Sequence, residues 1–98
     1  MNNNRTTTKN VTNDDIKVTK IAIKTNPHTL GISLMYTLNS GCAIKAYAIG
    51  DACKILMKGI GYLNSQFPEP LDFQPNVEIV KDSNGVLREA ITVTIRKI

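Results

Sequence analysis

Residues 20–50 read KIAIKTNPHTLGISLMYTLNSGCAIKAYAIG, and this stretch predicts a strand, a capped helix and a second strand with very short linkers. The helix begins after Asn26, whose side chain can accept a hydrogen bond from a free backbone N–H, and Pro27 suits the first helical position. It ends near Asn39, and Gly41 follows as a stop signal. Because the linkers leave opposite ends of the helix, the two strands must run parallel with the helix packed over them.

The rest of the chain predicts a second helix and a terminal hairpin. Apolar residues recur at three- and four-residue steps over 52–67, which is typical of an amphipathic helix, and prolines follow it. An alternating strand over 71–79 then leads to Asn84-Gly85, a typical turn, and to a last strand within 86–98.

Two of the predicted strands are irregular. Apolar positions change from even to odd numbers between Val18 and Ile21, so the first strand either starts near Thr19 or contains a bulge. Pro75 cannot donate to a strand ladder, so its strand lies at an edge, contains a bulge, or starts late, near Asn76.

The element order β-α-β-α-β-β predicts an α+β fold, a two-layer sandwich of a four-stranded mixed sheet with two helices on one face. Residues 1–15 are rich in Asn and Thr and lack the apolar residues that would offset the entropy of ordering them. We therefore expect a disordered tail over 1–15 and a single domain over 16–98.

The formal charge of +4 is concentrated near the start of the chain. Residues 1–26 hold five cations and two anions, a net charge of +3, whereas residues 27–98 hold seven cations and six anions, a net charge of +1. A pI near 9.2 is compatible with nucleic acid or another anionic partner. Composition alone does not choose between these partners.

Cys42 and Cys53 are the only cysteines, and they show neither CxxC spacing nor a companion His cluster. We expect both to be small buried apolar groups in a reducing compartment. No apolar run approaches the roughly 20 residues that span a bilayer, and the N-terminus lacks a secretory signal. These features predict a cytoplasmic protein without a membrane partner, and they allow association with the nucleoid.

The single histidine, His28, does not by itself indicate an enzyme. It has the chemistry of an acid or base, but no nucleophile lies near it at a recognised spacing, and a lone loop histidine is usually a hydrogen-bonding group. Gly59 and Gly61 follow no strand, so they predict a close helix contact in preference to a dinucleotide site. We expect no catalytic residue, no metal, no cofactor and no small-molecule substrate.

Polar and basic residues gather where the predicted helices begin. Lys24, Asn26 and His28 flank the start of the first helix. In a parallel β-α-β-α run both helix starts lie at the carboxyl end of the sheet, where helix N-termini attract anions. Three lysines on the second strand and second helix extend this basic region: Lys45, Lys54 and Lys58. The alternative is that these lysines are ordinary solvated charges.

Three segments in this order resemble the stage V sporulation protein S family of the Alba-like superfamily. They are KIAIKTNP at 20–27, AYAIG at 46–50 and the pattern Gly-x-x-Arg-x-Ala-Ile at 85–91. The resemblance covers about residues 20–96 and implies an Alba-like fold. It also implies a small nucleic-acid-binding protein, typically a dimer, without enzymatic activity and with a regulatory role in sporulation or development.

In Alba-like proteins the loop after the first strand meets the nucleic-acid backbone, which corresponds here to Lys24 with Asn26 and His28 beside it. The last hairpin of these proteins forms an arm along the nucleic acid, which corresponds here to Lys81, Asn84 and Arg88. A basic residue near the end of their second strand corresponds to Lys45. Residues 47–50 depart from the Arg-Gly-Arg type segment of archaeal members, so the sporulation branch fits better than chromatin-style binding.

Two hypotheses of different classes follow. The first is a homodimer that binds the phosphate backbone of DNA or RNA. Its sequence readout should be weak, because the chain has too few aromatic residues for a base-stacking platform. The second is a protein-interaction or assembly module that binds nucleic acid only incidentally. For the dimer contact we expect the apolar end of the second helix: Ile60, Leu63 and Phe67.

Overall fold

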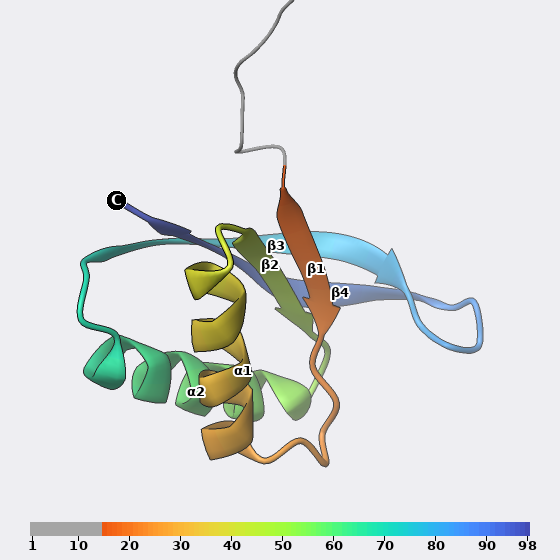
Figure 1. Ribbon diagram of the computed structural model, residues 1–98. Coiled ribbons are helices and arrows are strands. Elements are labelled where there is room, and N and C mark those ends of the chain that lie inside the picture. The colour runs from red at the N-terminus through yellow and green to blue at the C-terminus, as the bar shows by residue number, and fades with distance from the viewer. Residues whose placement is uncertain (1–14) are drawn as a thin grey trace, which may run out of the picture.

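The computed structural model describes residues 15–98 and arranges them as a sheet with two helices on one side (Figure 1). The elements are β1 (Ile16–Lys20), α1 (Pro27–Asn39), β2 (Ala43–Ala48), α2 (Ala52–Gln66), β3 (Leu71–Lys81) and β4 (Leu87–Lys97). This order confirms the predicted β-α-β-α-β-β succession and the α+β fold class. The tail predicted for residues 1–15 lies, except for its last residue, outside the described residues.

The four-stranded sheet has the order β1-β2-β4-β3. As predicted, β1 and β2 are parallel, and β4 runs antiparallel to both of its neighbours. Ile44 and Ala46 of β2 are completely buried beneath the helices, whereas Lys45 and Tyr47 alternate with them and point to the opposite side. We call these the helix side and the solvent side of the sheet.

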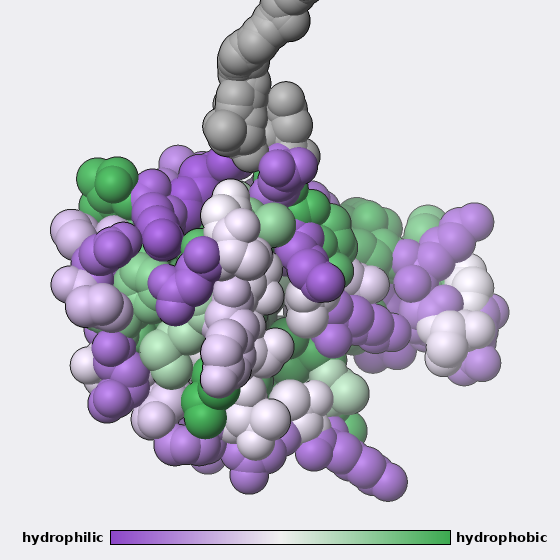
Figure 2. Space-filling model, viewed as in Figure 1, coloured by the Kyte–Doolittle hydropathy of each residue, from purple (hydrophilic) through white to green (hydrophobic). Residues whose placement is uncertain are grey.

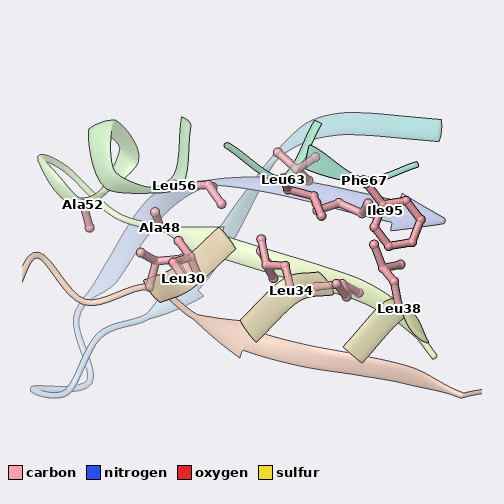
Figure 3. Packing of buried hydrophobic residues seen from close by; sticks show 13 residues of the cluster. Leu30, Leu34, Leu38, Ala48, Ala52, Leu56, Leu63, Phe67 and Ile95 are labelled. Carbon is pink, nitrogen blue, oxygen red and sulfur yellow. The ribbon is translucent and has the colours of Figure 1, made fainter. Parts of the chain in front are cut away.

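The core lies between the helices and the helix side of the sheet. Leu30, Leu34 and Leu38 recur at four-residue steps along α1, and each is no more than 5% exposed. Figure 3 shows these leucines among side chains from α2 and the sheet, including Leu56 and Ile95. Burial of large aliphatic side chains is the main favourable contribution to the stability of such a domain.

The end of α2 belongs to this core. Leu63 is completely buried, Phe67 is 8% exposed, and Ile60 is partly buried and packs against the same cluster. Leu63 and Phe67 are therefore not free to form the dimer contact predicted for them. The amphipathic pattern predicts the helix correctly, but the apolar stripe of the helix faces the chain's own core.

Local signals at the ends of α1 have the predicted roles. The side-chain oxygen of Asn26 accepts a hydrogen bond of 3.0 Å from the backbone N–H of Thr29, and Pro27 occupies the first helical position. Past the helix, Gly41 has φ +96°, a left-handed conformation that favours glycine.

The two helices cross at glycines. A Cβ added to Gly31 of α1 would lie 2.6 Å from Cδ2 of Tyr62, and one added to Gly59 of α2 would lie 2.6 Å from a methyl carbon of Leu30. This close contact confirms the prediction for Gly59, but not for Gly61, where a Cβ would meet nothing within 4 Å.

The first strand differs from the prediction. β1 is regular from Ile16 to Lys20, so it begins earlier than Thr19. Ile16 and Val18 lie on the solvent side, whereas Ile21 follows the strand and is buried, with its backbone N–H donating to the carbonyl of Tyr47 at 2.9 Å. The change from even to odd apolar positions therefore marks a change of side at the strand end.

The predicted hairpin is confirmed, and Pro75 lies within β3, which is an edge strand. The last residue of β2 to pair with β4 is Ala48, opposite Ile91, so the hairpin beyond that point extends past β2. We call residues 77–91 the arm and the remaining described residues the body. The loop 82–86 closes the arm and is longer than a two-residue turn, with Gly85 at φ +80°.

Candidate functional site

The carboxyl ends of β1 and β2 form one edge of the sheet, and three structural features converge there. The loop 21–26 leads into α1, and the loop 49–51 leads into α2, so both helix N-termini start at this edge. The arm projects from the same edge, because it continues β3 and β4 beyond Ala48 (Figure 1). Helix N-termini carry partial positive charge, which makes this edge suited to an anion.

Lys24 is exposed in the loop between β1 and α1, where a backbone hydrogen bond of 3.0 Å from Thr25 to Ala22 closes a tight turn. Asn26 uses its side-chain oxygen to cap α1, so only its amide N–H groups remain for a ligand. The ring of His28 lies against that of Tyr62, with centroids 4.2 Å apart. Of these three predicted residues, Lys24 alone carries a full positive charge at neutral pH, and it has no ion pair among residues 15–98.

The first half of α2 adds two exposed lysines, Lys54 and Lys58, at a spacing of one helical turn. Within residues 15–98, neither has a carboxylate within ion-pair distance. Asp51 precedes the helix without making a side-chain capping bond, and its carboxylate offsets part of the positive charge at the edge. The edge therefore holds more lysines (Lys24, Lys54 and Lys58) than carboxylates (Asp51).

Two other predicted cations have carboxylate partners. Lys45 Nζ lies 2.9 Å from Oε2 of Glu78, and the guanidinium of Arg88 lies 3.5 Å from Oδ2 of Asp82. A phosphate that binds either cation must compete with this partner. Lys45 also projects from the solvent side of the sheet, away from the loop that holds Lys24.

The tip of the arm is ordered by Asp82 more than by the residues predicted there. Oδ1 of Asp82 accepts hydrogen bonds of 2.9 Å from the backbone N–H groups of Val86 and Asn84. These bonds, led by the one from Val86, and the nearby Arg88 hold the pKa of the Asp82 carboxyl below its ordinary value of 3.8. Lys81, just before this loop, and Asn84, within it, are exposed.

The arm and the body differ in charge. The arm holds two cations and three anions, a net charge of −1, whereas the described part of the body holds eight cations and four anions, a net charge of +4. The cations predicted to meet the nucleic acid on the arm, Lys81 and Arg88, are therefore outnumbered by the carboxylates of the arm. The uncompensated positive charge lies on the body.

The arm also exposes apolar side chains. Four of them lie on the helix side of the sheet but beyond the part that the helices cover, and they are between 41% and 64% exposed. They are Val77, Ile79, Leu87 and Ile91. We call these four residues the apolar strip. In Figure 2 the arm stands clear of the body, with green apolar surface beside purple polar side chains.

Two relevant residues, Lys20 and Glu78, are not among those predicted from the sequence. Lys20, the last residue of β1, is exposed on the solvent side opposite Tyr47 and has no ion pair among the described residues. Its place next to the predicted edge was a signal available in the sequence. Glu78, the partner of Lys45, could not be found without the register between β2, β4 and β3.

The chain matches no protein-family model and no curated protein. Among solved structures, Alba from Thermoplasma volcanium is similar, with a TM-score of 0.63 and 12% sequence identity, over 83% of this chain and 100% of that chain. The fold is therefore Alba-like, as the resemblance implied. In the part of the chain that the structure describes, neither helix is long and apolar enough to cross a membrane.

Proposed function

We propose that this chain is a small dimeric protein that binds DNA or RNA through the phosphate backbone, without catalytic activity. The observation that carries the proposal is the gathering of two helix N-termini with Lys24 and Lys54 at one edge of an Alba-like fold. Lys58 continues this basic edge along α2. Unpaired lysines next to helix N-termini attract phosphate whatever the base sequence.

The aromatic side chains support backbone binding over base stacking. Phe67 is buried and Phe73 is partly buried, both packed with the core. Tyr47 is half-buried on the solvent side, Tyr62 lies against His28, and Tyr36 is exposed on α1. These positions do not form a row of ring faces on which successive bases stack, so sequence readout should be weak.

We place the dimer contact on the apolar strip of the arm in place of the end of α2. Contiguous apolar side chains that remain exposed on a small domain mark an interaction surface. Full burial of an aliphatic side chain contributes about 1.5–3 kcal/mol, so covering the exposed half of each would contribute on the order of 1 kcal/mol. A symmetric pair uses the strip twice, because both copies present the same surface.

A regulatory role of the sporulation or developmental type remains part of the proposal. Its support is the resemblance of residues 20–27, 46–50 and 85–91 to the sporulation branch of the superfamily. A modest net charge of +4 also suits a regulator that binds nucleic acid reversibly better than a protein that coats it.

The second candidate function is a protein-interaction module, and the arm is the observation that favours it. With a net charge of −1 and an apolar strip, the arm has the properties of a protein-binding surface more than those of a phosphate-binding one. On this alternative the basic edge would be incidental, and the partner would be a protein of the same regulatory complex.

Salt-dependent binding separates the two candidates. Fluorescence anisotropy with labelled duplex DNA and single-stranded RNA at 50–200 mM salt should give a linear dependence of log K on log salt (about −0.9 per phosphate neutralised on duplex DNA and about −0.7 on single strands). Absence of binding to both polymers at the lowest salt would contradict the proposed function, and the interaction module would then be the better account.

A further inference from the structure

The ion pair between Lys45 and Glu78 joins two strands that are not neighbours. Lys45 lies on β2 opposite Thr94, Glu78 lies on β3 opposite Ala90, and β4 runs between them. The Nζ of Lys45 therefore crosses the solvent side of β4 to reach both carboxylate oxygens of Glu78, at 3.0 Å from Oε1 and 2.9 Å from Oε2. The pair connects the body to the base of the arm.

A buried residue of β4 also contacts the pair. Thr92 of β4 is 2% exposed, and its hydroxyl lies 3.4 Å from Oε2 of Glu78. The side chains of Lys45 and Glu78 are 35% and 33% exposed, so each is partly shielded from water while part of it stays accessible. Such a pair is screened by salt less than a fully exposed one.

The other ion pairs of the described residues are looser. Arg88 and Asp82 lie 3.5 Å apart, and Lys97 and Glu69 lie 3.7 Å apart. Glu78 holds its cation more closely and with both oxygens, at 3.0 and 2.9 Å. A carboxylate in this arrangement occupies the position that two phosphate oxygens would take at Lys45.

Glu78 also decides the charge of the solvent side. By register, the same side carries Lys20 on β1 and both Arg88 and Arg96 on β4 in addition to Lys45, and Arg88 is paired with Asp82. Asp72 lies opposite Arg96, which leaves Glu78 as the carboxylate that compensates Lys45. Without Glu78, this side of the sheet would present Lys20 and Lys45 on neighbouring strands as a second basic surface.

We propose that Glu78 acts as a built-in competitor for phosphate at Lys45, and that it closes the solvent side of the sheet to the nucleic-acid backbone. The inference rests on the proposed function and adds which surface the polymer uses. Phosphate at Lys45 must displace Glu78, and the displaced carboxylate would stay beside the phosphate, where like charges repel. Binding is thereby confined to the edge that holds Lys24.

The test compares two variants that remove one negative charge each from the arm. Glu78→Gln keeps the size of the side chain and a hydrogen-bonding group for Thr92, but it releases Lys45. Glu89→Gln is the control for charge, because Glu89 is exposed on the helix side of the arm, away from Lys45, and has no ion pair among residues 15–98. Glu89 lies opposite Ile79 of the apolar strip, so the oligomeric state of this variant is measured as well. Thermal melting and light scattering show whether both variants keep the fold and the oligomeric state.

For Glu78→Gln we expect tighter binding to duplex DNA and a salt slope steeper by about 0.9, the value for one additional phosphate contact. Adding Lys45→Met to Glu78→Gln should return the slope to that of the parent. Glu89→Gln should leave the slope unchanged. Equal effects of Glu78→Gln and Glu89→Gln, or an unchanged slope in Glu78→Gln, would overturn the inference while the proposed function stands. A parent protein that binds neither polymer would overturn both.

Discussion

The body and the arm use the same alternating strands, but their apolar side chains have different surroundings. On the body, residues such as Ile44 and Ile95 lie under two helices and are completely buried. On the arm, the same side of the sheet extends past the helices, and Ile79 is 60% exposed. The two regions also differ in charge, with +4 on the described part of the body and −1 on the arm.

Because of this difference, substitutions in the two regions should affect different properties, folding stability for the body and association for the arm. The apolar side chains of the body that lie under the helices are covered by the chain itself, so their truncation should change the free energy of unfolding. Those of the arm need a partner to be covered, so their substitution should change the dissociation constant of the dimer. Because the positive charge lies on the body, we also expect phosphate to bind there and not on the arm.

The largest expected effect is on the core of the body. Leu63→Ala removes a completely buried side chain and should lower the free energy of unfolding by about 2–5 kcal/mol. Ile79→Ala on the arm removes a largely exposed side chain and should lower it by less than about 1 kcal/mol in dilute, monomeric protein. Urea denaturation of both variants measures the difference. Equal losses would show that the arm is as well covered as the body.

The helix crossing gives a smaller effect with an internal control. Gly31→Ala forces a Cβ against Tyr62 and the backbone carbonyl of Gly59, so it should destabilise the body by about 1–2 kcal/mol despite the better helix propensity of Ala. Gly61→Ala meets nothing within 4 Å and should stabilise the helix by about 0.5–1 kcal/mol. The melting temperature should fall for Gly31→Ala and rise for Gly61→Ala. A change of the same sign in both variants would contradict the crossing geometry.

The dimer contact is tested by placing the same charge on each region. Ile79→Glu puts a carboxylate into the apolar strip and should weaken the dimer at least tenfold, or about 1.4 kcal/mol. Val18→Glu is the control, because Val18 is 62% exposed on the solvent side of the body, away from the strip. Sedimentation equilibrium measures both dissociation constants. A dimer that tolerates Ile79→Glu but not Val18→Glu would place the contact on the body.

The smallest expected effect is at the tip of the arm. The folded pKa of Asp82 is lowered, so its contribution to stability is present above the ordinary pKa and is lost as the pH falls through the folded value. Amide resonances of Asn84 and Val86, followed by NMR from neutral pH into acid, should therefore titrate with a midpoint below 3.8. Asp82→Asn should remove this transition. A midpoint at or above pH 3.8 would contradict the hydrogen bonds that Asp82 accepts in the loop.

Local signals in the sequence were sufficient for the elements and their order. Asn26 and Pro27 start α1 by satisfying the backbone at its N-terminus, and Gly41 ends it by adopting a positive φ, so each acts through its immediate neighbours. Pro75 indicated an edge strand, a bulge or a late strand start for an equally local reason, the missing N–H, and the structure shows the edge strand. The parallel pair followed from linker length alone.

The features that the sequence did not reveal depend on distant parts of the chain. The apolar stripe that ends in Leu63 and Phe67 is the same whether it faces a core or a second copy, and only packing against the sheet distinguishes the two. The ion pair of Lys45 depends on the register of three strands, which the sequence does not fix. The candidate site was therefore predictable as a set of cations, but not as a set of free cations.

The central claim is that phosphate binds at the basic edge of the body and not along the arm. Two double variants test it with equal loss of charge: Lys24→Ala with Lys54→Ala at the edge, and Lys81→Ala with Arg88→Ala on the arm. The measurement is the salt slope of log K for duplex DNA. The account predicts a slope flatter by about 1.8 for the edge variant, which loses two phosphate contacts, and a clearly smaller change for the arm variant. An arm variant that flattens the slope as much as or more than the edge variant would contradict it.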